Sequence, residues 1–89
     1  MDEAIILAML EDLAERLDIE IRYERVRDNE SLQRGGLCRL KGKYLVIVDK
    51  KASTGERIVV LSRAVRHFDL DDIYMKPLLR QYLEDRPGE

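Results

Sequence analysis

The chain has 89 residues, of which 45% are apolar, so it is long enough for one domain and too short for two. Its 16 basic and 18 acidic side chains leave a net charge of −2, which argues against both a basic nucleic-acid wrapper and a self-repelling disordered chain. One cysteine excludes an internal disulfide, the start Met1-Asp2-Glu3 is acidic where a secretory signal is basic, and no long apolar run is present. These features predict a cytoplasmic protein without a membrane span, with one domain over residues 1–86 and a frayed end over residues 87–89.

The charges are unevenly distributed along the chain. Residues 1–20 sum to −6, residues 21–68 to +7 and residues 69–89 to −3. A basic middle segment could bind an anion or a nucleic acid, or acidic helices could lie against a basic sheet rim. We favour the second explanation, because acidic residues populate the first turns of helices and the basic residues here are scattered singly.

The first segments of the chain predict a helix, a strand and a loop. Residues 2–17 carry apolar side chains at three- and four-residue spacing, with Asp2 placed to cap the helix and Glu3 in its first turn. The apolar side chains of this helix are Ile6, Met9, Leu10, Leu13, Ala14 and Leu17. Residues 19–26 alternate between apolar and charged, as in a half-buried strand, and the polar residues 27–36 predict a loop.

Residues 37–48 are typical of a β-hairpin with a two-residue turn at Lys41-Gly42, where glycine supplies a positive φ. The register that follows places two sets of side chains on opposite faces. One set, which we expect to face the core, comprises Cys38, Leu40, Leu45 and Ile47. The other comprises Leu37, Arg39, Tyr44, Val46 and Val48.

The second face of this hairpin carries more large apolar side chains than a soluble monomer usually leaves in water. We therefore predict a homodimer interface there, formed by Leu37, Tyr44, Val46 and Val48. The alternative is that the loop over residues 27–36 or the last helix covers this face.

The remaining residues predict two further helices. Ser53 and Glu56 fit a capping box at the start of a helix that runs to about Phe68. Its apolar stripe comprises Ile58, Leu61, Val65 and Phe68, widened by Val60 and Ala64. Pro77 suits the first turn of a last helix. The order helix, strand, hairpin, helix, helix predicts an α+β two-layer domain, with a small, mostly antiparallel three-stranded sheet and helices packed on one face.

Few residues are suited to acid–base or metal chemistry. His67 is the only histidine, and with Asp69, Asp71 and Asp72 it forms a weak candidate group for a divalent cation. Capping of the neighbouring helix ends explains these acids more simply. Cys38 has no base near it in the sequence, so we expect a packed thiol, no bound metal and no cofactor.

Residues 36–69 resemble the core of small zincin metallopeptidases. The likeness consists of a glycine-turn hairpin, the apolar strand Leu45-Val46-Ile47-Val48, a short polar loop and a capped helix. In that family the equivalent helix carries His-Glu-x-x-His. The resemblance implies that Ser62 and Arg66 take the places of the two histidines and that Arg63 takes the place of the catalytic glutamate.

Arginine stays protonated, so it can neither ligate a cation nor act as a general base. The resemblance therefore implies a zincin-like scaffold with a degenerate, inactive metal site. The chain is also similar to short bacterial proteins that share the segment Gly-Gly-Leu-Cys-Arg-Leu and the acidic segment Asp69-Leu70-Asp71-Asp72, and this second likeness implies no activity.

The leading hypothesis is a non-catalytic domain that acts through protein–protein contacts, first of all with itself. The alternative is a small nucleic-acid or anion-binding module that uses basic residues around the hairpin. Its candidate contacts are Arg25, Arg27, Arg34, Arg39, Lys41 and Lys43. The same residues also suit solvated strand edges, where Lys and Arg discourage pairing with other sheets. An enzyme would depend on His67 alone and is the third hypothesis.

Overall fold

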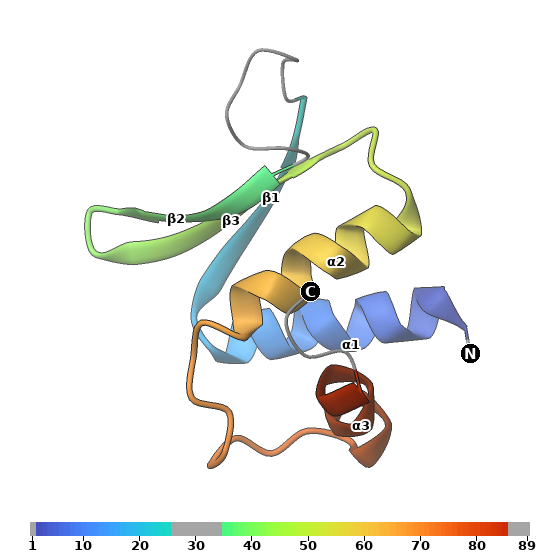
Figure 1. The fold of residues 1–89 in the computed structure, drawn as a ribbon. Coiled ribbons are helices and arrows are strands. Elements are labelled where there is room, and N and C mark those ends of the chain that lie inside the picture. The colour runs from blue at the N-terminus through green and yellow to red at the C-terminus, as the bar shows by residue number, and fades with distance from the viewer. Residues whose placement is uncertain (1, 26–34, 86–89) are drawn as a thin grey trace.

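A computed structural model describes residues 2–25 and 35–85 (Figure 1). The elements follow the predicted order: α1 (Glu3–Arg16), β1 (Ile19–Glu24), β2 (Gly35–Leu40), β3 (Lys43–Asp49), α2 (Thr54–Val65) and α3 (Pro77–Asp85). The α+β class is confirmed. Residues 27–34 of the predicted loop and the frayed end over residues 87–89 lie outside the described residues, whereas Gly35 and Gly36 belong to β2 and not to the predicted loop.

The first two predicted helices begin with the expected caps. The carboxylate of Asp2 accepts a hydrogen bond from the backbone nitrogen of Ala4 at 2.9 Å. At the start of α2, the Ser53 hydroxyl accepts from the backbone nitrogen of Glu56 and the Glu56 carboxylate accepts from that of Ser53, which completes the capping box. The second helix ends at Val65, three residues earlier than the sequence predicts.

The sheet has the strand order β1-β3-β2, and it is mixed rather than mostly antiparallel. The β2–β3 hairpin is antiparallel, whereas β1 pairs with β3 in parallel. The central strand β3 is apolar on both faces, and its residues Val46 and Val48 are fully buried on the face that the helices cover. The hairpin register is confirmed at Leu37–Val46, Cys38–Leu45 and Leu40–Lys43. Both turn residues have a positive φ, 53° at Lys41 and 82° at Gly42, as a type I′ turn requires.

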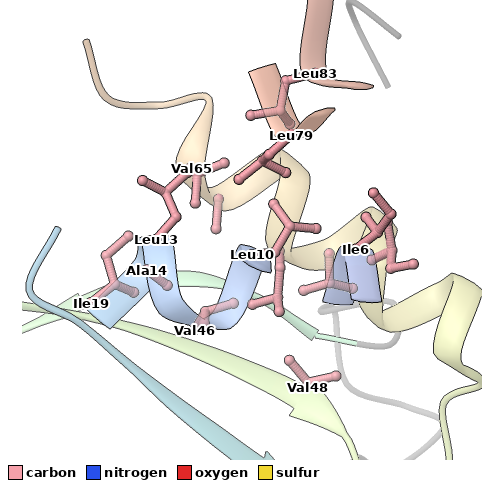
Figure 2. Close-up of a cluster of buried hydrophobic side chains, with 14 of the residues drawn as sticks. Ile6, Leu10, Leu13, Ala14, Ile19, Val46, Val48, Val65, Leu79 and Leu83 are labelled. Carbon is pink, nitrogen blue, oxygen red and sulfur yellow. The ribbon is translucent and has the colours of Figure 1, made fainter. Parts of the chain in front are cut away.

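The two main helices lie on one side of the sheet, and α3 lies beyond α1 (Figure 1). The helices α1 and α2 cover the face that carries Val46 and Val48, both of which have 0% exposure. Figure 2 shows these two valines in one cluster with Ile6, Leu10 and Leu13 of α1. Leu37 and Tyr44 are half-buried against the same cluster.

The predicted interface of Leu37, Tyr44, Val46 and Val48 is therefore wrong, because this face is the core of the chain itself. The hairpin is apolar on both faces, so its own pattern does not decide which face the helices cover. The parallel strand β1 decides it. Its apolar residues Ile19, Ile21 and Tyr23 stand opposite Tyr44, Val46 and Val48, whereas its charged residues share the other face. The covering elements are α1 and α2.

The connection between α2 and α3 is held by arginine side chains that donate to backbone carbonyls. Arg80 donates to the carbonyls of Leu70 at 3.3 Å and Ile73 at 2.7 Å. Arg66 donates to the carbonyl of Leu83 at 2.8 Å, and Arg16 to that of Tyr74 at 2.6 Å. These bonds fix α3 against the other two helices. Within residues 2–25 and 35–85, no helix has the length and apolar character needed to cross a bilayer.

Candidate functional site

The three α2 residues that the zincin resemblance assigns to the metal site lie in different environments. Ser62 is buried with 4% exposure, and its hydroxyl makes no hydrogen bond within the described part of the chain. Arg63 is exposed to solvent. Arg66 lies one turn beyond Ser62, and its guanidinium is directed to the Leu83 carbonyl of α3. The three side chains therefore do not converge on one point.

The acidic group near His67 forms a turn. The Asp69 carboxylate accepts a hydrogen bond from the backbone nitrogen of Asp71 at 3.0 Å, and the imidazole of His67 is exposed. Asp72 is exposed as well. Among the residues that the structure describes, no three His, Cys, Asp or Glu side chains are placed to hold a metal ion.

The basic residues of the alternative hypothesis are only partly brought together. Lys41 and Lys43 lie exposed at the tip of the hairpin, and the guanidinium of Arg39 stands 5.3 Å from the ring centroid of Tyr44. Arg25 follows the last residue of β1, which pairs with Asp49 at the opposite end of the sheet, about 20 Å from the tip by strand rise. Arg27 and Arg34 lie outside the described residues.

A hollow of about 270 Å³ lies at the hairpin tip. Its lining residues are Glu20, Arg22, Leu40, Lys41, Lys43, Tyr44 and Leu45. The Arg22 side chain pairs with Glu20 at 2.8 Å, so the two lysines supply the excess positive charge of this hollow.

A cluster that the sequence analysis missed joins α1, β1 and α2. The Tyr23 hydroxyl donates to the Glu11 carboxylate, and the guanidinium of Arg57 stands 4.9 Å from the centroid of the Tyr23 ring. Arg57 also donates to the carbonyls of Ala52 at 3.1 Å and Lys50 at 3.0 Å. Burial, and then the hydrogen bond to Glu11, raise the pKa of Tyr23. The tyrosine therefore remains a donor, which suits a structural role.

The outer face of the hairpin carries an apolar strip that no described helix covers. We call these residues the outer strip: Cys38, Leu40, Leu45 and Ile47. Leu40 is 55% exposed, Cys38 and Ile47 are half-buried, and Leu45 has 6% exposure between Cys38 on one side and Glu20 on the other. The sequence analysis identified this set correctly but assigned it to the core.

A hollow with a volume of about 600 Å³ lies between α1 and α3. We call it the α1–α3 groove, and its lining residues are Ala4, Ile5, Ala8, Met9, Asp12, Arg16, Lys76 and Leu79. Ile5 is 52% exposed. The sequence analysis did not single out this surface, although Ala4, Ile5, Ala8 and Met9 form a second apolar stripe on the first helix.

Comparisons of the chain with protein families, with curated proteins and with solved structures each gave no match.

Proposed function

We propose that this protein is a non-catalytic interaction domain that acts through protein–protein contacts, and that the outer strip carries the contact. The observation that supports this proposal is the apolar strip on the sheet face opposite the helices, in which Leu40 is 55% exposed and Cys38 and Ile47 are half-buried. A second copy of the chain is the first candidate partner, because a two-fold interface buries one surface twice.

The charges beside the outer strip suit a two-fold contact. The strip is flanked by Glu20 and Arg22 on the same face of β1. When two such faces meet about a two-fold axis, the glutamate of one copy can lie near the arginine of the other. The flanking charges are then complementary rather than repulsive.

Leu40→Glu tests this contact. The side chain is largely exposed, so the variant should fold, and the new charge should prevent association of the strips. By sedimentation across a concentration series, we expect a wild-type dimer and a monomeric variant that still unfolds in one cooperative transition. Tyr74→Ser is a matched control, because Tyr74 is an apolar side chain, 74% exposed, outside the strip. A monomeric wild type at high concentration would contradict the proposal.

We also propose that the scaffold is zincin-like with a degenerate metal site. The observed order of a helix, a strand, a hairpin and a capped helix supports this likeness. Ser62, Arg63 and Arg66 stand at the positions that the resemblance assigns to the metal site, and neither arginine can ligate zinc.

Elemental analysis tests the degenerate site. We expect protein purified without chelator to carry far less than one zinc per chain, because arginine replaces both a ligand and the general base. Stoichiometric zinc that survives dialysis would contradict the proposal.

The second candidate function is anion or nucleic-acid binding at the hairpin tip. The observation that favours it is the hollow beside Lys41 and Lys43. Heparin elution across a salt series distinguishes it from the first candidate, because phosphate or sulfate contacts impose a steep dependence on salt. If this function holds, Lys41→Ala with Lys43→Ala should shift elution to lower salt, whereas Lys76→Ala should matter less.

A further inference from the structure

We infer that the α1–α3 groove binds an amphipathic helix of a partner protein, one that carries acidic residues beside its apolar stripe. This surface is separate from the outer strip, so the inference goes beyond the proposed function and does not depend on it.

The first helix has two apolar stripes, and only one of them enters the core. Ile6, Leu10 and Leu13 are buried with exposures of 1% or less. The second stripe lines the groove with Ala4, Ile5, Ala8 and Met9, of which Ala4, Ile5 and Ala8 are exposed. A helix that buries one stripe in its own domain normally has a polar opposite face. Met9 is half-buried against the core, whereas Ala4, Ile5 and Ala8 leave the rest of this stripe open to solvent.

The shape of the groove suits a helix. Its lining follows α1 from Ala4 to Arg16, which is about 18 Å of helix axis, with Leu79 of α3 on the other wall. Ala4 and Ala8 lie one turn apart, and their small side chains allow a second helix to approach closely. Helices in contact pack at about 8–10 Å between axes, and the distance falls as the side chains become smaller. An apolar groove of this kind recognises residues at helical spacing.

The charges on the groove select the sign of the partner. The lining contains one acid, Asp12, and two bases, Arg16 and Lys76. Arg16 pairs with Asp12 at 3.1 Å and donates to the Tyr74 carbonyl at 2.6 Å. Lys76 is exposed and forms no ion pair within the described residues. At the start of α1, the Glu3 carboxylate lies against Gly55 of α2, and the Asp2 carboxylate caps the helix at the backbone nitrogen of Ala4. Among the lining residues themselves, the excess is one positive charge, that of Lys76.

Two designed peptides test the inference directly. Both are helical, about 18 residues long and share one leucine stripe, and they differ only in flanking residues, glutamate in one and lysine in the other. We use the Leu40→Glu protein as background, so that contacts through the outer strip do not interfere. NMR titration should move the amide signals of Ala4, Ala8, Met9 and Leu79, and the glutamate peptide should bind about two- to fivefold tighter than the lysine peptide.

Three variants distinguish specific binding in the groove from nonspecific binding of the peptides to the protein. Lys76→Glu should reverse the preference between the two peptides. Ala8→Gln replaces an exposed helical alanine with a good helix former, so the protein should fold while both peptides bind at least about tenfold more weakly. Arg63→Gln removes an exposed positive charge on α2, outside the groove, and should leave both affinities unchanged.

Each of the remaining outcomes overturns the inference. The inference is wrong if neither peptide shifts the groove amides, or if both peptides bind equally with no response to Lys76→Glu. It is also wrong if a second copy of the chain fills the groove, which is the result if the Leu40→Glu protein remains a dimer in sedimentation and Ala8→Gln makes it monomeric. A monomeric wild type refutes the proposed self-association through the outer strip and leaves the peptide result unaffected.

Discussion

Tyr23 contacts both main helices, which no sequence pattern predicts. Its place in an alternating strand identifies it as an apolar residue that faces the helices, and it is packed there. Its hydroxyl reaches Glu11 of α1, and its ring lies beneath the guanidinium of Arg57 from the first turns of α2. The same arginine holds two carbonyls of the β3–α2 connection, so one cluster joins both main helices to the sheet.

The raised pKa of Tyr23 predicts how stability depends on pH. An unfolded tyrosine loses its proton near pH 10, and the folded state retains it to higher pH. This contribution is therefore complete below about pH 10 and is lost as the pH rises through the unfolded pKa toward the raised folded value. Urea denaturation between about pH 8 and 11 should show a steeper fall in the unfolding free energy for the wild type than for Tyr23→Phe. Parallel curves for the two proteins would contradict the prediction.

Local signals determine the elements, and nonlocal pairing determines how they assemble. Asp2, Ser53 and the Lys41-Gly42 turn act over two to four residues, which is why the sequence predicts the starts of α1 and α2 and the hairpin register. The parallel pairing of β1 with β3 joins residues about 25 positions apart, such as Ile21 and Val46. No local pattern encodes such a pairing, so the sequence analysis predicted a mostly antiparallel sheet.

The capping box of α2 should make a measurable contribution to stability. Ser53→Ala leaves the backbone nitrogen of Glu56 without its side-chain acceptor, which is 3.1 Å away in the structure. We expect the unfolding free energy to fall by about 1 kcal/mol. Thr54→Ala is the matched control, because Thr54 is exposed in the first turn and alanine favours the helix. Equal losses in the two variants would show that the cap is not the cause.

At the scale of the whole molecule, the sequence predicts that one face of the hairpin is covered and one is open, but assigns them the wrong way round. The decision lies with β1, whose apolar side chains align with Val46 and Val48 only once the parallel register is known. The α1–α3 groove is harder to predict from the sequence than the covered face of the hairpin. Its second wall depends on where α3 docks, and that docking is held by arginine bonds to carbonyls of Leu83, Ile73 and Tyr74. Such bonds to backbone leave no sequence pattern.

One core serves both main helices, so truncating either helix should weaken the entire domain. Leu13 of α1 and Leu61 of α2 both have 0% exposure in the same cluster. Replacing either with alanine leaves a cavity and should cost about 2–5 kcal/mol. Leu78→Ala is the control for the same truncation at a site that is 41% exposed, and it should change stability by no more than about 0.5 kcal/mol. A domain of this size has only about 5–10 kcal/mol in total, so thermal melts should show a single transition displaced strongly downward for the two core variants. A melt of Leu61→Ala that matches the wild type would mean that α2 does not close this core.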